Sequence, residues 1–238
     1  QKALDNIAFE VKKGEVVGFL GPNGAGKSTM MKIISCFIAP TSGKVTVEGF
    51  DIIEDSMKVR QLVGYLPESN PLYHDMYVKE YLGLVWGLYG MMGDKAARIE
   101  EMISVTGLGR EQHKQIGQLS KGYRQRVGIA QALIHEPEIL ILDEPTSGLD
   151  PNQLVEIRGL IRALGRDKTV MFSSHLMHEV EAVCDRVIII HNGKLVTDGK
   201  VKGDPTDMRL QSLPVAFEQD VPSADLSDIP EVTRVEPV

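Results

Sequence analysis

The segment that most constrains this chain is a glycine-rich loop near its N-terminus, Gly21-Pro22-Asn23-Gly24-Ala25-Gly26-Lys27-Ser28-Thr29. It follows the apolar run 16–20 and precedes a stretch with helical patterning. A strand, a G-x-x-x-x-G-K-S loop and a helix form a phosphate cradle, because glycines let several backbone N–H groups turn toward one anion. The positive end of the helix strengthens the site. We therefore predict that Lys27 reaches the β- and γ-phosphates and that the Ser28 hydroxyl binds Mg²⁺.

Composition sets broad limits on the class of protein. The chain has 238 residues, 42% of them hydrophobic and 25% charged, which is typical of a globular protein. Its net charge of −7 argues against a nucleic-acid partner, which would require a basic face. The two cysteines, Cys36 and Cys184, are interpreted as small buried residues in a reducing compartment. We find no signal peptide and no run of about 20 apolar residues, and we interpret the start at Gln1 as lacking the natural N-terminus.

Hydrophobic periodicity predicts an α/β protein with a helical block in its middle. The block runs from residue 77 to residue 134 and shows no strand pattern. The predicted strands are 3–11, 16–20, 44–47, 63–66, 139–142, 169–173, 187–190 and 194–196. The predicted helices are 28–38, 78–91, 95–105 with Asp94 as N-cap, a helix capped by Ser120 that runs to about residue 134, 153–164 and 178–184.

The same patterns divide the chain into parts. We predict one domain over residues 1–205, in which 1–70 and 137–205 form the core with a β part and 71–136 form an inserted helical subdomain. Residues 203–238 contain five prolines and mostly acidic charge. We interpret 206–238 as a poorly ordered or partial C-terminal extension, with one possible strand at 215–218.

A pair of carboxylates follows the apolar strand 139–142. Ligands of open α/β sheets lie at the carboxyl ends of the strands, where Asp143 and Glu144 fall. Asp143 is expected to bind Mg²⁺, directly or through water. Glu144 is expected to polarise the attacking water. Ordinary surface acids are the alternative, and the phosphate loop upstream makes them the poorer interpretation.

Two further segments carry candidate site residues. In Leu119-Ser120-Lys121-Gly122-Tyr123-Arg124-Gln125-Arg126, a serine and a glycine open a helix, which offers a second set of free N–H groups to an anion or is a plain N-cap. His175 follows the strand 169–173. A single histidine there is more often structural, but this one lies at the same sheet edge as the phosphate loop and could donate to a γ-phosphate oxygen.

The phosphate loop, residues 119–126, residues 140–150 and His175 occur in the order seen in ATP-binding cassette (ABC) ATPases, which the chain resembles over roughly residues 3–200. The resemblance implies a P-loop NTPase (RecA-like) core with a mixed, mainly parallel sheet, an N-terminal antiparallel β part and an inserted α-helical subdomain. It implies binding and hydrolysis of ATP with Mg²⁺.

The resemblance also implies partners. A second ATPase subunit, presumed identical, would pair head to tail, so that residues 21–29 bind ATP in cis while Ser120 and Gly122 complete the γ-phosphate shell in trans. Asp150 would lie at the dimer seam, beside the catalytic acid. A polytopic transmembrane subunit would contact the helical subdomain, which places the chain in the cytoplasm on the inner face of the membrane.

Details of the sequence refine this resemblance. The chain most resembles the branch that serves bacterial drug, polysaccharide and gliding-motility exporters. Residues 65–73, Tyr-Leu-Pro-Glu-Ser-Asn-Pro-Leu-Tyr, and the run 119–150 are similar to the gliding-motility type. Glu68 replaces a glutamine that is usual in the family, where it could still bind Mg²⁺ but adds negative charge. Lys121 and Tyr123 replace the third and fifth residues of the usual Leu-Ser-Gly-Gly-Gln signature. The aromatic residue that stacks on adenine is expected upstream of Gln1, and Phe9 is expected in the core.

Two other functions compete with a transporter subunit. A member of the same ATPase class that acts on ribosomes or DNA usually has two cassettes or a coiled coil and a basic surface, unlike this chain. A GTPase or kinase is the other alternative, but we find no N-K-x-D guanine motif, since Asn192-Gly193-Lys194-Leu195 does not fit it.

Overall fold

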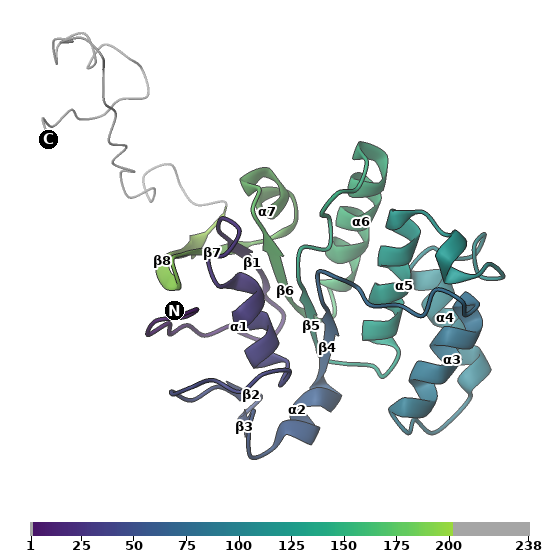
Figure 1. The fold of residues 1–238 in the computed structure, drawn as a ribbon, viewed down its shortest axis with the longest axis horizontal. Helices are drawn as coiled ribbons and strands as arrows, with labels where there is room; N and C mark the ends of the chain where they lie inside the picture. The colour runs from purple at the N-terminus through teal and green to yellow at the C-terminus, as the bar shows by residue number, and fades with distance from the viewer. Residues whose placement is uncertain (1, 202–238) are drawn as a thin grey trace, which may run out of the picture. The chain divides into compact units, whose positions relative to one another are not determined.

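A computed structural model describes residues 2–201 of the chain (Figure 1). Its main sheet has six strands in the order β4-β5-β6-β1-β7-β8, and all neighbours are parallel except β7 and β8. The main-sheet strands are β1 (Val16–Leu20), β4 (Val63–Leu66), β5 (Ile139–Leu142), β6 (Thr169–Ser174), β7 (Arg186–His191) and β8 (Lys194–Lys200). A separate antiparallel pair consists of β2 (Thr46–Val47) and β3 (Phe50–Asp51).

Helices cover both faces of the main sheet. They are α1 (Lys27–Ile34), α2 (Ser56–Leu62), α3 (Val78–Leu88), α4 (Lys95–Val105), α5 (Lys121–Leu133), α6 (Pro151–Leu164) and α7 (Met177–Val183), with a 3₁₀ turn η1 (Ile116–Gln118). The mixed sheet and its flanking helices confirm the predicted α/β class. Between residues 71 and 136 the described elements are helical, as expected for the inserted block.

The alternation of side chains along each strand creates two separate cores. On β6, Val170 and Phe172 point to a large cluster shared with α3 through α7. Met171 points to the other face, toward a smaller cluster with residues of α1 and of β2. Because successive strand residues face opposite sides, one continuous apolar run serves both cores. As a result, α1 and α5 lie on opposite faces of the sheet.

The predicted strand at residues 3–11 is wrong, because the structure assigns no strand there. The alternation that suggested it is nevertheless visible in burial: Ile7, Phe9 and Val11 are half-buried against the smaller core, and the residues between them are exposed. Phe9 packs edge-on against Phe19, with ring centroids 5.3 Å apart, so it belongs to the core as expected. Periodicity reports which side chains are buried and does not supply a partner strand for hydrogen bonding.

Two helices end earlier than predicted, for the same reason. After α1, Cys36 adopts a left-handed conformation (φ 58°), and the Phe37 N–H bonds back to the Lys32 carbonyl. This is a Schellman turn in which a cysteine occupies the position usually taken by glycine, so the sequence gives no stop signal. α3 ends in the same way, with Gly90 in the left-handed region (φ 62°), so the expected helix to residue 91 is also too long.

Most of the remaining boundaries are close to the prediction, but β8 runs to Lys200 instead of ending at residue 196, and β2 covers only the last two residues of the predicted strand 44–47. The bounds of β1, β4, β5 and α4 agree with the expected ranges, and Asp94 caps α4 by accepting the amides of Ala96 and Ala97. α2 and β3 lie where the sequence suggested no element. The expected strand at 215–218 and the extension at 206–238 lie outside the described residues.

Candidate functional site

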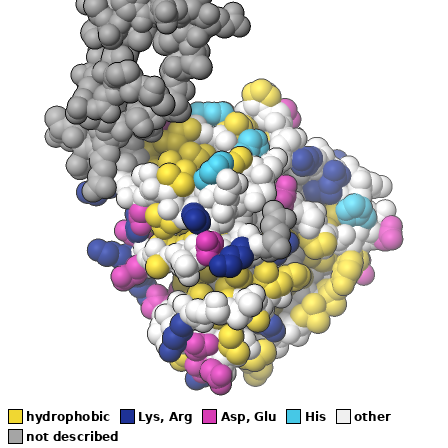
Figure 2. All heavy atoms as spheres, turned by 60° about the vertical axis from the view of Figure 1, so that its left-hand side comes forward, with side chains coloured by type: hydrophobic (Ala, Val, Ile, Leu, Met, Phe, Trp, Pro, Cys, Tyr) yellow, Lys and Arg dark blue, Asp and Glu magenta, His cyan; other side chains and the backbone are white. Residues whose placement is uncertain are grey.

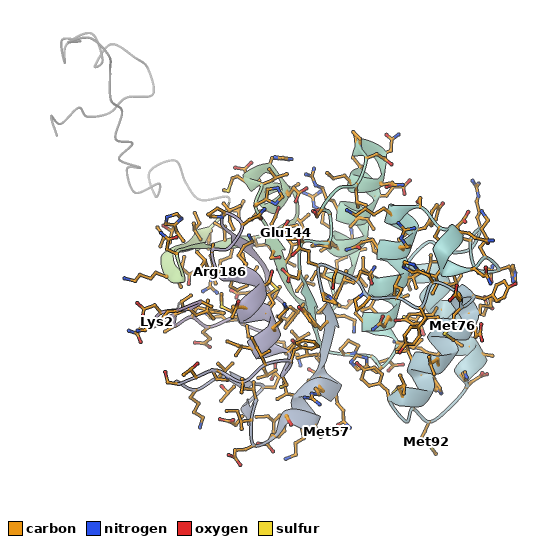
Figure 3. All side chains as sticks on the ribbon, viewed as in Figure 1. Lys2, Met57, Met76, Met92, Glu144 and Arg186 are labelled. Carbon is orange, nitrogen blue, oxygen red and sulfur yellow. The ribbon has the colours of Figure 1, made fainter. Side chains whose placement is uncertain are left out.

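The strand order brings the predicted site segments to one edge of the sheet. Gly21 follows β1, Glu68 comes two residues after β4, Asp143 and Glu144 follow β5, and His175 follows β6. These four strands are consecutive neighbours and run parallel, so their carboxyl ends meet at the same edge. Figure 3 shows Glu144 at this edge, away from the helical region that carries Met76 and Met92.

The phosphate loop wraps over the start of α1. Gly26 is the N-cap residue and has a φ of 109°, a conformation that side chains other than glycine rarely adopt. Lys27 is 5% exposed and turns back into the loop. Its Nζ donates to the carbonyls of Gly21 at 2.6 Å and Pro22 at 3.3 Å. The loop thus fixes a positive charge beside the N-terminus of a helix, which is what an anion site requires.

The other predicted loop residues form a mostly open rim around this lysine. Pro22, Asn23 and Gly24 are exposed, Ala25 is buried, and Gly26, Ser28 and Thr29 are half-buried. Open glycine-rich backbone beside a buried cation leaves N–H groups accessible to a phosphate chain.

Ser28 and Asp143 meet although 115 residues separate them. The Ser28 hydroxyl donates to Asp143 Oδ1 at 3.0 Å, and the Ser173 hydroxyl donates to the same oxygen at 2.7 Å. Among the described residues, the buried Asp143 Oδ2 has no hydrogen-bond partner. A hydroxyl oxygen beside a carboxylate with a spare buried oxygen is the donor set that Mg²⁺ prefers, so these residues fit the expected ion.

The Glu144 carboxylate lies between Lys27 and His175, the two side chains expected to contact a phosphate. Its carboxylate is 6% exposed; Oε1 lies 3.4 Å from Lys27 Nζ, and Oε2 lies 3.0 Å from His175 Nδ1. Its backbone is left-handed (φ 48°), and its N–H donates to the Ser173 hydroxyl at 2.8 Å. A strained backbone held by its neighbours is frequent at functional sites. The carboxylate is therefore fixed at the sheet edge, next to the cradle.

Glu68 is placed less closely. It is exposed, and within residues 2–201 it forms no hydrogen bond to Ser28 or Asp143. Burial raises the pKa of Tyr65, and the charges of Asp143 and Glu68 raise it further, so both acids lie near this tyrosine. Residues 2–201 contain no group of three or more His, Cys, Asp or Glu side chains arranged to hold a metal ion. The oxygen set in contact is therefore Ser28 and Asp143, with Glu68 in the same region.

The second predicted anion site belongs to the other side of the sheet. Ser120 is the N-cap of α5; its hydroxyl accepts from the Tyr123 amide at 3.4 Å and from Gln153 Nε2 at 3.3 Å. Asp150 is the N-cap of α6 and accepts the Gln153 amide at 2.9 Å. A Cβ on Gly122 would lie 2.6 Å from the Gln153 side chain. One residue, Gln153, thus connects Ser120, Gly122 and Asp150.

Sequence reasoning missed two residues that the structure places in this network. Ser173 joins Asp143 to the backbone of Glu144, and Gln153 joins the starts of α5 and α6. The signal for Ser173 was available, since a hydroxyl at the end of a strand next to the acidic strand lies within reach of its carboxylates. Gln153 had no comparable signal, because its contact depends on how two helices pack.

Fold and site together define a P-loop nucleotide triphosphatase. The family model for ABC transporters matches residues 4–147. The chain belongs to the ABC transporter family as one of its ATP-binding subunits, and it is an ATPase.

Relatives and solved structures agree with this assignment. The chain is 41% identical over 219 residues to the ABC transporter ATP-binding protein NatA of Bacillus subtilis (91% of this chain, 89% of NatA). It is 39% identical over 200 residues to the bacitracin transport ATP-binding protein BcrA of Bacillus licheniformis (83% of this chain, 65% of BcrA). A dimeric post-hydrolysis state of the ATP-binding cassette MJ0796 bound to ADP and Pi matches with a TM-score of 0.77 and 30% identity, over 85% of this chain and 92% of that one.

The family also bears on how such subunits assemble. ABC ATP-binding subunits of transporters generally dimerise and pair with transmembrane subunits. None of the helices within residues 2–201 is both long and apolar enough to cross a bilayer.

Proposed function

We propose that this chain energises a membrane exporter as a head-to-tail pair of ATPase subunits that enclose two ATP molecules. One observation carries the proposal: the two helix ends that we predict to bind anions belong to α1 and α5, which lie on opposite faces of the sheet. In the described residues, the side chain of Ser120 bonds to Tyr123 and Gln153 and makes no hydrogen bond to residues 21–29. A nucleotide in the cradle of one chain therefore needs a second chain to bring Ser120 and Gly122 to its γ-phosphate.

In this proposal, the residues of the cradle act on the triphosphate. Lys27 leaves the carbonyls of Gly21 and Pro22 and binds the β- and γ-phosphates, while the backbone N–H groups of residues 21–29 cradle them. Bringing Ser120 of a second chain against the γ-phosphate closes the site to bulk water. Asp150 lies at the seam between the chains, where it caps α6.

The acidic residues supply the hydrolytic chemistry. Glu144 orients the attacking water and takes its proton as the water oxygen bonds to the γ-phosphorus. The bond from that phosphorus to the β–γ bridging oxygen breaks, and ADP leaves with that oxygen. His175, 3.0 Å from Glu144, orients that carboxylate and donates to a γ-phosphate oxygen. Ser28 and Asp143 would hold Mg²⁺, with Glu68 as a further candidate, and the bound ion would neutralise charge on the phosphates.

The exporter assignment comes from relatives and from the surface of the helical subdomain. BcrA is named for bacitracin transport, LnrL of Bacillus subtilis for linearmycin resistance and YbhF of Escherichia coli as a probable multidrug transporter protein. Residues of α3 line an open groove of about 530 Å³ together with Met76 and Lys95, and one of the lining residues, Leu88, is 75% exposed. We infer that this groove receives a polytopic transmembrane subunit, which holds the chain at the cytoplasmic face of the membrane. The gliding-motility type of exporter stays a prediction.

The second candidate, an ABC-class ATPase that acts on ribosomes or DNA, has less support. Figure 2 shows Lys and Arg side chains interspersed with Asp and Glu on the face it draws, rather than gathered into a basic stripe. Nucleic-acid binding depends on concentrated positive charge.

Co-purification tests the proposed partner. The full chain, extracted from membranes with mild detergent, is expected to bring a polytopic membrane protein with it and to hydrolyse ATP when Mg²⁺ is added. Recovery in the ribosomal or DNA-bound fraction, with no membrane protein attached, would instead support the second candidate. The Glu144→Gln variant is the control that assigns the measured hydrolysis to this chain.

A further inference from the structure

Glu179 on α7 is a buried carboxylate for which the reaction described above has no use. It is 3% exposed and lies four residues after His175. Removing a carboxylate from water is strongly unfavourable unless hydrogen bonds and an opposite charge compensate it. The contacts of Glu179 therefore indicate what its burial achieves.

Two hydroxyl groups donate to the same oxygen of this carboxylate. Thr146 Oγ1 lies 2.7 Å from Glu179 Oε2, and Ser174 Oγ lies 2.5 Å from it. Thr146 comes two residues after Glu144, and Ser174 comes directly before His175. Glu179 thus fastens together the two chain segments that carry Glu144 and His175.

The other carboxylate oxygen of Glu179, Oε1, faces an arginine of α6. Glu179 Oε1 lies 3.8 Å from Arg158 Nη2, whose side chain is 18% exposed. Among the described residues, the buried Nε and Nη2 of Arg158 have no hydrogen-bond partner, so the carboxylate is the charge that compensates this guanidinium. α6 begins at the N-cap Asp150, the residue expected at the dimer seam. The carboxylate of Glu179 therefore contacts three elements: the loop that carries Glu144, the end of β6 just before His175, and α6, which begins at the expected dimer seam.

This geometry bears on the pair formed by Glu144 and His175. Their 3.0 Å contact joins two segments that are 31 residues apart, and the backbone of Glu144 is in a left-handed conformation. A displacement of about 1 Å in a reacting group can cost about 10²-fold in rate. The contact can persist only if both segments are held, and Thr146 and Ser174 are the points at which Glu179 holds them.

We propose that Glu179 is a positioning residue for hydrolysis, which keeps Glu144 and His175 in register and ties them to the helix that begins at the dimer seam. The proposal rests on the proposed function of Glu144 and His175. In this proposal, Glu179 affects hydrolysis through Glu144 and His175 and does not contact ATP.

The test compares Glu179→Gln with Glu181→Gln in the full chain. Glutamine keeps the size of the side chain but removes the charge that pairs with Arg158 and weakens its acceptance of two hydroxyls. Glu181 lies on the same helix and is exposed, so it is a matched control. We expect Glu179→Gln to lower kcat about 10–100-fold while KM and ATP affinity stay within about twofold, and Glu181→Gln to leave all three unchanged.

A second variant separates positioning from folding. Thr146→Val removes one of the two hydroxyls at nearly constant volume, and should lower kcat less than Glu179→Gln does, again without changing KM. The double variant should be no slower than Glu179→Gln alone, because both changes remove one interaction. If Glu179→Gln does not fold, Thr146→Val alone decides: an unchanged kcat overturns the proposal, and an isolated fall in kcat supports it.

The outcomes also distinguish this proposal from the proposed function. If Glu144→Gln abolishes hydrolysis and Glu179→Gln folds and turns over normally, the positioning role is wrong and the proposed function stands. An equal loss of kcat and ATP affinity in Glu179→Gln would also overturn it, as it would indicate general loss of structure. If the wild-type chain, with Mg²⁺ and its membrane partner, does not hydrolyse ATP, the proposed function fails first.

Discussion

The ammonium group of Lys27 lies 3.4 Å from Oε1 of Glu144, and both side chains are almost fully buried, at 5% and 6% exposure. The lysine comes from the phosphate loop after β1 and the glutamate from the loop after β5, with β6 between the two strands. The two residues expected to act on the γ-phosphate thus form one buried charge pair. Loss of Lys27 removes the cation nearest to the buried Glu144 carboxylate, which has consequences for stability as well as for activity.

Replacing Lys27 with alanine should therefore have two effects. ATP affinity should fall at least about tenfold, because the cradle loses its cation, and the free energy of unfolding should fall by about 3–5 kcal/mol, because Glu144 is left buried without its partner. Nucleotide titration and urea unfolding measure the two effects. Lys32→Ala, on the same helix but half-exposed, should change neither. Undiminished ATP affinity in Lys27→Ala would contradict the assignment of the cradle.

Glu144→Gln should separate binding from hydrolysis. The amide keeps the shape of the side chain but cannot accept a proton from water, so turnover should fall about 10²–10⁴-fold while ATP still binds. Steady-state phosphate release and nucleotide binding provide the measurement. Glu138→Gln is the control, because Glu138 precedes the opposite end of the same strand. Wild-type turnover in Glu144→Gln would remove this residue from the chemistry.

Ser120→Arg should prevent the ATP-dependent dimer. In the Glu144→Gln background, ATP is retained and two chains should stay together; an arginine at the start of α5 would fill the space that a partner's γ-phosphate needs. Size-exclusion chromatography with and without ATP shows the difference. Ser104→Arg, at an exposed position of α4, should still dimerise. A stable dimer of the Ser120→Arg variant would refute the trans role of this serine.

His135 should make the fold sensitive to acid. Its ring stacks on Tyr89 at 4.0 Å and contacts the Val63 carbonyl. Burial, together with the nearby charges of Lys168 and Arg98, lowers the pKa of His135 to about 4. In the unfolded chain the pKa is about 6.5. The unfolded state therefore binds a proton between these values and the folded state does not, so stability is full above about pH 6.5 and falls as the pH drops toward 4.

Urea unfolding at pH 7 and pH 4.5 measures this contribution. His135→Phe keeps a stacked ring without the titrating group, and should lose about 2–3 kcal/mol less than the wild type between the two pH values. His113→Gln, at an exposed position, should follow the wild type. Equal acid sensitivity of His135→Phe and the wild type would assign the loss to other groups.

The sequence by itself determined the local features of this protein. The phosphate loop, the apolar strands β1, β4 and β5, and the caps Asp94 and Ser120 were all predictable, because each depends on residues within a few positions of one another. The motifs that indicated the family are also local, because each is a short run of residues that can be recognised in the sequence. The helix ends at Cys36 and Gly90 were missed, since the left-handed turns there were not read from the pattern.

Only the tertiary structure decided which of these features meet. The sheet order places β6 between β1 and β5, so that Ser173 and His175 reach the acids while Lys27 faces Glu144. The tertiary structure also decided that residues 3–11 bury alternate side chains without joining a strand ladder. It placed Glu179 in contact with both Thr146 and Ser174, next to the candidate site. The physical reason is that such contacts join residues far apart in the chain. Periodicity reports which side of an element is buried, and only the packing of the elements selects the partner.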